Sequence, residues 1–117
     1  MTGIFYQMDL LGSALDASEK NHRVVSQNIA NVNTPGYKTK RLEFERLLAQ
    51  LQSPDAKGAS DEPLPVKDLE GLAERMDGNN VNLEQEVAEL KENALAFQAF
   101  SHLLASRVST MRRAISG

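Results

Sequence analysis

The sequence predicts an all-α protein in which two long terminal helices form a coiled-coil unit, joined by a central segment that is mostly extended or irregular. Three observations predict this class. Apolar residues recur in steps of four and three near each end, a stretch near the C-terminus carries no charge, and all four prolines lie in the middle. The 117 residues suit a single domain, covering 1–117.

The C-terminal helix is expected over about 83–116. Asn82 is a suitable N-cap with Gln85 as its partner, and glutamates near the start and arginines near the end match the helix dipole. Small Ser101 fills the one slot that the apolar seam skips. The expected packing residues, with Phe100 beside the seam, are Leu83, Val87, Leu90, Ala94, Phe97, Phe100, Leu104, Val108, Met111 and Ile115.

The stretch from Asn93 to Ser106 contains no Asp, Glu, Lys or Arg. A helix that is apolar around most of its circumference must be covered on more than one side. At about 1.5 Å per residue this helix is roughly 50 Å long, and the rest of the chain is too small to cover it. We therefore expect other subunits to cover it, because an exposed apolar surface of this size would promote aggregation.

The N-terminal helix is expected over about 4–32, with the same seven-residue repeat, which implies a left-handed supercoil. The simplest arrangement pairs the two helices antiparallel, or side by side if the middle of the chain runs back along them. His22 is expected to be a polar seam residue that sets the register rather than a metal ligand with His102, because no i,i+4 histidine pair exists. The seam residues are Ile4, Met8, Leu11, Leu15, Ser18, His22, Val25 and Ile29.

An asparagine-rich segment stops this first helix. Pro35-Gly36 fits a type II turn with positive φ at Gly36, and asparagine side chains can satisfy the free backbone groups of a helix end. Ending a helix does not require three asparagines together with a Pro-Gly pair. The presence of all of them favours a role in packing and assembly. The residues of this motif are Asn28, Asn31, Asn33, Thr34, Pro35, Gly36 and Tyr37.

The middle of the chain, about 33–81, is expected to be irregular. A short helix fits from Arg46 or so onward, 53–65 is typical of a loop, and 66–76 should be extended or weakly ordered. Asp77-Gly78 predicts a turn before the last helix. It does not predict a calcium loop, because the glycine is misplaced and the closing glutamate is missing.

Composition excludes several classes of function. Lys and Arg are scattered and the net charge is -3, so we expect no nucleic-acid partner. Cysteine is absent and Ser, His and Asp share no nucleophile pattern, so we expect neither catalysis nor a metal or other cofactor. No stretch approaches the roughly 20 apolar residues of a membrane span, and the N-terminus does not resemble a signal peptide. Any export would use a route without cleavage.

The segment from Ser26 to Lys38, SQNIANVNTPGYK, resembles the signature of the bacterial flagellar rod, hook and filament-junction proteins. Val32 stands where that family often has alanine. The segment from Arg75 to Asn82, with Glu84 and Glu86, is similar to one branch of the rod proteins. Together the two resemblances cover roughly residues 4–46 and 75–117.

The resemblance implies a D0-like unit of two terminal helices that serves as a structural subunit of the proximal rod in the flagellar basal body. It implies passage through the flagellar type III export apparatus without a cleaved signal peptide, and a final place in the periplasmic rod without direct membrane insertion. The implied partners are further copies of the chain, FlgC-, FlgF- and FliE-type rod proteins, the membrane ring and the export gate.

Phe44 and Leu48 resemble the short aromatic-then-aliphatic segment by which early flagellar substrates are recognised at the export gate. A single amphipathic turn that packs on the core would show the same pattern. Two alternatives to the rod function also remain open at this point: another rod protein of the same family, and a soluble helical coiled-coil adaptor.

Overall fold

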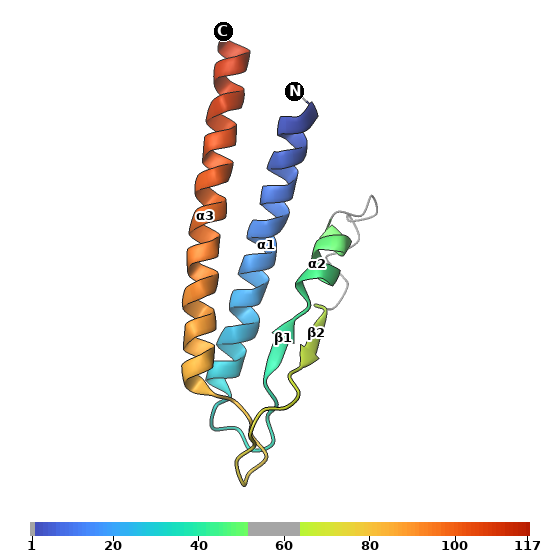
Figure 1. Ribbon diagram of the computed structural model, residues 1–117, viewed down its shortest axis with the longest axis vertical. Helices are drawn as coiled ribbons and strands as arrows, with labels where there is room; N and C mark the ends of the chain where they lie inside the picture. The colour runs from blue at the N-terminus through green and yellow to red at the C-terminus, as the bar shows by residue number, and fades with distance from the viewer. Residues whose placement is uncertain (1, 52–63) are drawn as a thin grey trace.

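The computed structural model describes residues 2–51 and 64–117, an elongated molecule of 65 × 29 × 20 Å. Its elements in order are α1 (Thr2–Ala30), β1 (Lys40–Leu42), α2 (Phe44–Leu51), β2 (Val66–Asp68) and α3 (Leu83–Ser116). Helices α1 and α3 lie side by side and antiparallel, with both chain ends at the same end of the molecule (Figure 1). The predicted fold class is confirmed, with a small strand pair added in the middle.

The two long helices end where polar side chains satisfy their backbone groups. Asn82 has extended backbone geometry, and its side-chain oxygen accepts a hydrogen bond from the Gln85 amide at 3.2 Å, so the predicted cap is present. Helix α1 ends at Ala30, two residues before the expected end. There the Asn31 side chain donates to the Gln27 carbonyl at 2.7 Å, which satisfies one of the last free carbonyls of the helix.

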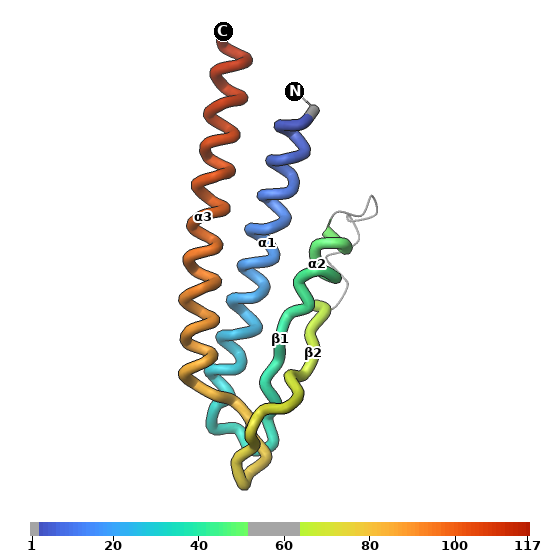
Figure 2. The backbone as a smooth tube through the Cα atoms, in the orientation of Figure 1, coloured from blue at the N-terminus to red at the C-terminus, as the bar shows by residue number. Residues whose placement is uncertain are grey.

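The central segment runs back along α1 (Figure 2). Strands β1 and β2 pair antiparallel, with Arg41 opposite Lys67. Helix α2 begins at Phe44, slightly earlier than expected. The expected loop at 53–65 lies, apart from its last two residues, outside the described residues.

The apolar core of the molecule lies between α1 and the central segment rather than between α1 and α3. Its buried members come from α1, β1 and α2, and further leucines of α2 and Leu64 pack against them. The most amphipathic element, α2, therefore has the role of covering one side of α1. The buried cluster consists of Ala17, Val24, Leu42 and Leu47.

The contact between α1 and α3 is polar at its most buried points. The buried residues of α3 are Glu86 and Asn93. Asn93 accepts a hydrogen bond from the Asn21 side chain at 3.1 Å and donates to the Ser18 carbonyl at 2.7 Å. His22 is exposed, so it does not set the register of this contact within one molecule. The buried Asn21–Asn93 pair occupies the position that fixes the register between the helices, because each amide would lose its partner if the helices slipped.

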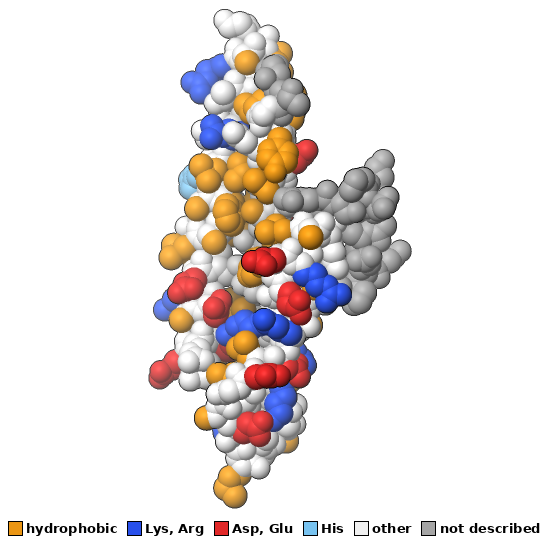
Figure 3. Space-filling model, turned by 45° about the vertical axis from the view of Figure 1, so that its right-hand side comes forward, with side chains coloured by type: hydrophobic (Ala, Val, Ile, Leu, Met, Phe, Trp, Pro, Cys, Tyr) orange, Lys and Arg blue, Asp and Glu red, His pale blue; other side chains and the backbone are white. Residues whose placement is uncertain are grey.

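Burial divides the molecule into two halves along its long axis. In the distal half, residues 3–16 of α1 and 94–116 of α3, no side chain is buried. All buried residues of the two long helices lie in the basal half, from Ala17 to Asn28 and from Glu86 to Asn93. Figure 3 shows a hydrophobic surface reaching across the upper part of the molecule, while acidic side chains lie mainly lower down. Within the described ranges, no helix is long and apolar enough to span a bilayer.

Candidate functional site

The two segments that carry the family resemblance meet at the base of the hairpin. The Gly36 amide donates to the Asp77 carbonyl at 2.8 Å, and the Asn80 amide donates to the Tyr37 carbonyl at 3.3 Å. A methyl group on Gly78 would lie 3.4 Å from the Gly36 Cα, so the two turns pack glycine against glycine. We call this assembly of residues 26–41 and 75–86 the basal clasp.

The predicted turn after α1 is confirmed. The Tyr37 amide donates to the Thr34 carbonyl at 3.2 Å, and Gly36 between them has φ of 76°. These features define a type II turn with glycine at the position that needs positive φ. Asn33 and Pro35 are exposed, so they belong to the surface of the clasp rather than to its buried interior.

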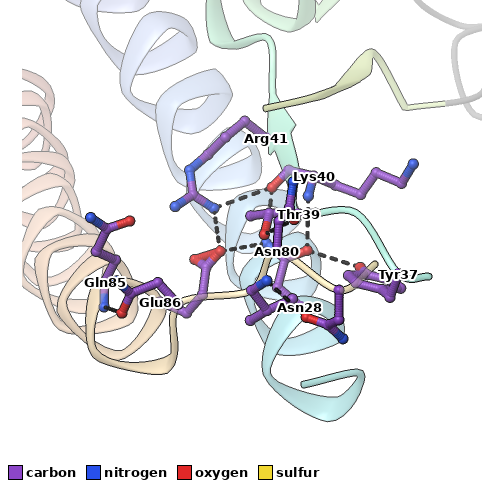
Figure 4. A network of polar contacts seen from close by, with 11 residues as sticks. Asn28, Tyr37, Thr39, Lys40, Arg41, Asn80, Gln85 and Glu86 are labelled. Carbon is purple, nitrogen blue, oxygen red and sulfur yellow. Dashed lines mark hydrogen bonds and ion pairs between the residues drawn. The ribbon is translucent and has the colours of Figure 1, made fainter. Parts of the chain in front are cut away.

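Asn28 is the centre of the clasp (Figure 4). It is fully buried, and its side chain forms every hydrogen bond that an amide can form. Its nitrogen donates to the Lys40 carbonyl and to Glu86 Oε1, both at 2.9 Å. Its oxygen accepts from the Tyr37 hydroxyl at 2.8 Å and from the Lys40 amide at 3.0 Å. One side chain of α1 thus holds the turn, β1 and α3 together.

Glu86 adds a buried charge to this network. Its side chain is 1% exposed, and its Oε1 accepts from Arg41 Nη1 at 2.8 Å as well as from Asn28. Its other oxygen, Oε2, is buried without a hydrogen-bond partner among the described residues. The positive charge of Arg41 therefore offsets the free-energy cost of burying the Glu86 carboxylate.

Two further asparagines fasten the second segment. The Asn79 side chain donates to the carbonyls of Asn31 and Thr34, at 2.9 and 2.8 Å, and accepts from the Val81 amide at 2.8 Å. The Asn80 side chain accepts from both the amide and the hydroxyl of Thr39, at 2.7 and 2.9 Å. The chain entering α3 is thereby fixed to the chain leaving α1.

Tyr37 is held in its neutral form by this environment. Burial raises the pKa of the Tyr37 phenol, and the nearby Lys40 opposes the rise. A protonated hydroxyl is what the contact with Asn28 requires, because the hydroxyl is the donor in that hydrogen bond.

The predicted seam residues are mostly uncovered within one molecule. Ser18 and Val25 are buried, the others are half-buried or exposed, and the exposed ones are His22, Leu83, Ala94, Phe97 and Ile115. On α3 the buried residues Glu86 and Asn93 are seven apart and lie one position before the seam. Helix α3 therefore contacts α1 through a face that is rotated from the predicted seam. That face carries the polar side chains that form hydrogen bonds and an ion pair with α1 and β1.

The two candidate export residues differ in their surroundings. Phe44 opens α2 and is exposed, whereas Leu48 is half-buried and packs against the core cluster. The buried Leu47 lies between them. The structure thus gives α2 a packing role through Leu47 and Leu48 and leaves Phe44 on the surface.

The sequence did not reveal the polar residues whose hydrogen bonds and ion pair join α1, β1 and α3. It assigned Glu86 to the helix dipole, and it gave no role to Arg41, Asn21 or Asn93. One signal was available for Asn21 and Asn93, since each is an uncharged polar residue beside an otherwise apolar seam. No signal was available for Arg41, because its contact with Glu86 joins residues 45 positions apart. Within the described ranges, no three His, Asp or Glu side chains gather as a metal site would require.

The fold and clasp define a small subunit of two extended helices whose free ends present uncovered apolar faces. A sequence model of the family "Flagella basal body rod protein" matches residues 8–38, the C-terminal part of which forms half of the clasp. A segment covering 37% of the chain is 44% identical to the flagellar basal-body rod protein FlgG of Agrobacterium fabrum, over 16% of that protein.

Two relatives match along nearly their whole length. The flagellar basal body rod protein FlgB of Cereibacter sphaeroides strain ATCC 17029 is 31% identical, over 100% of this chain and 99% of its own. FlgB of Aeromonas hydrophila is 30% identical, over 89% of this chain and 88% of its own. The chain therefore belongs to the FlgB family of flagellar basal body rod proteins, and it is a structural subunit of the rod.

Proposed function

We propose that the chain builds the proximal part of the rod by packing its two long helices among those of neighbouring subunits, without catalysis or a cofactor. The observation that carries this proposal is the distal half, where 14 residues of α1 and 23 of α3 lie outside any buried core. Burying one leucine or phenylalanine side chain contributes about 1.5–3 kcal/mol, so covering this half would provide the driving force for assembly.

The surface of the distal half suits helical neighbours. A groove between α1 and α3 is lined by the apolar Leu15, Leu104 and Val108 and by the small Ser101 and Ala105. Phe97 and Leu103 remain 43% and 48% exposed. Small residues beside large apolar ones are what a neighbouring helix needs for close packing of ridges into grooves.

The partners in this proposal are further copies of the chain, FlgC-, FlgF- and FliE-type rod proteins, and the membrane ring. The chain would reach the periplasm through the flagellar type III apparatus without a cleaved signal peptide. Folding and binding are coupled in this scheme, since the distal half gains its buried contacts only on arrival. The finished rod would then transmit torque mechanically.

Recognition at the export gate would use Phe44 and Leu48. Leu48 packs on the core in the folded chain, so the two side chains are accessible together only before folding. Phe44→Ala should reduce secretion. Leu47→Ala is the matched control, because it removes a buried side chain from the same helix and should weaken the fold while leaving secretion intact. Equal secretion of both variants would remove this role from Phe44.

Deletion of the gene followed by imaging of basal bodies tests the main proposal. We expect a membrane ring without a rod. Circular dichroism over a range of concentrations separates the rod subunit from a soluble adaptor. A rod subunit should lose part of its helix content when dilute, whereas an adaptor should remain fully helical as a small oligomer of fixed size.

A further inference from the structure

One stripe of α3 is acidic at its basal end, uncharged in its middle and basic at its distal end. The α-helix has about 3.6 residues per turn, so residues spaced three or four apart lie along one side of α3 and form this stripe. Six of its members are exposed and three half-buried. The stripe consists of Glu89, Glu92, Ala96, Ala99, Leu103, Ser106, Arg107, Thr110 and Arg113.

The charges at both ends of the stripe are free to meet a neighbour. Glu89, Glu92, Arg107 and Arg113 belong to no ion pair among the described residues, whose ion pairs lie elsewhere. Between the two ends the stripe carries small side chains and Leu103, and these allow a second helix to approach closely. In Figure 3 basic side chains lie near the end that carries the termini, while acidic and further basic side chains are mixed toward the base.

We propose that this stripe binds a second copy of the chain in parallel orientation, shifted along the axis so that the basic end of one stripe lies against the acidic end of the next. The shift from Glu92 to Arg113 is 21 residues, about 32 Å along a helix. That is close to half of the 65 Å molecule. The stripe is complementary to itself at this shift and repulsive to itself when two copies lie parallel and level.

Such an interface is open, because each copy uses its acidic end for one neighbour and its basic end for the other. Head-to-tail contacts of this kind extend into a helical array rather than closing as a pair. The proposal rests on the rod function proposed above and adds the axial stagger between copies. An antiparallel pair would also match acidic to basic ends, but it would close and stop growth.

Charge reversal tests the stripe in cells whose only copy is the variant. Arg107→Glu with Arg113→Glu, or Glu89→Arg with Glu92→Arg, should each lower the fraction of flagellated cells on the order of tenfold or more, because like charges then face each other. All four changes in one chain should restore most of it. Lys91→Glu is the control, since it reverses one exposed charge of the same helix off the stripe.

The combined variant separates assembly from helix stability. Its reversed charges oppose the helix dipole at both ends of α3. If the charges acted only within one molecule, the combined variant would therefore have a lower fraction of flagellated cells than either half-reversed variant. Recovery in that variant supports the proposal, and the poorest flagellation there overturns it. Wild-type flagellation in both half-reversed variants would also overturn the stagger while leaving the rod function intact. Flagella in the deletion strain would instead overturn the rod function.

Disulfide cross-linking tests the orientation, and the chain has no cysteine of its own to interfere. Gln85→Cys with Ser106→Cys places two exposed thiols 21 residues apart on the same side of α3, which matches the proposed shift. In basal bodies from flagellated cells, oxidation should give a ladder of dimers, trimers and longer species. Ala99→Cys alone should give no dimer. A dimer from Ala99→Cys, or no ladder from the double variant, would overturn the parallel stagger.

Discussion

The basal and distal halves of this hairpin are built on the same two helices but are stabilised by different means. In the basal half, α1 is covered on one side by the apolar core and on another by Asn93, Glu86 and the clasp. In the distal half, α1 and α3 pack on each other, and among the described residues the end of α2 reaches this half only at Leu51, which lines a pocket with residues 6–16 of α1. The comparison shows a division of roles: polar contacts within the chain stabilise the basal half, whereas the distal half keeps an uncovered apolar surface that is proposed to bind neighbouring subunits.

The largest expected effect comes from a charge in the distal half. Phe97→Asp should abolish rod assembly and motility, because the carboxylate would be buried only when neighbours arrive. Phe97 is exposed in the single molecule, so secretion and the melting of the purified chain should hardly change. Gln85→Asp, an exposed position of the first turn of α3, is the control. Normal swimming of the Phe97→Asp strain would remove the distal half from the assembly interface.

Next in size is the loss of Asn28 from the basal half. Asn28→Ala leaves the Lys40 amide, the Tyr37 hydroxyl and Glu86 without their buried partner, and we expect about 3–5 kcal/mol of destabilisation. Urea unfolding followed by circular dichroism measures it. Asn33→Ala in the same motif is exposed and should change the unfolding free energy by less than about 0.5 kcal/mol. Similar losses in both variants would contradict the central role of Asn28.

A smaller effect is expected at the turn that joins the halves of the clasp. Gly36→Ala places a side chain at φ of 76°, where L-residues are strained by roughly 1–2 kcal/mol. No atom outside the adjacent residues lies within 4 Å of the added methyl, so the cost is conformational rather than steric. The unfolding midpoint in urea should fall accordingly. Pro35→Ala combined with Gly36→Ala should further misdirect the chain after α1 and reduce flagellation; wild-type flagella in that strain would make the turn a dispensable connector.

The smallest effect concerns Tyr37. Tyr37→Phe removes one hydrogen bond to Asn28 and should cost about 1 kcal/mol at neutral pH. Because the pKa of Tyr37 is raised on folding, the folded state holds the phenolic proton more tightly than the unfolded state. The resulting stabilisation is present below the unfolded pKa of about 10 and is lost as pH rises through the folded pKa. The unfolding free energy of the wild type should therefore fall more steeply above pH 10 than that of Tyr37→Phe.

The long helices, the Asn82 cap and the type II turn could be predicted because each rests on local signals: a seven-residue repeat, a capping residue and a Pro-Gly pair. The interior of the clasp could not. Glu86 follows the pattern of a solvated first-turn acid, and only the return of the chain along α1 in β1 brings the Arg41 side chain to it. His22 fitted the repeat better than Asn21, yet Asn21 is the buried one, because α3 contacts α1 along a face rotated from the seam.

Both chain ends lie together at the far end of the distal half (Figure 1). A tag or fluorescent protein fused to either terminus would therefore sit beside the surface proposed for assembly, and a larger fusion would compete with incoming subunits. An epitope inserted next to exposed Gly71 would lie in the basal half instead. Labels for imaging this subunit in living cells should accordingly be placed inside the chain, near that glycine, rather than at its ends.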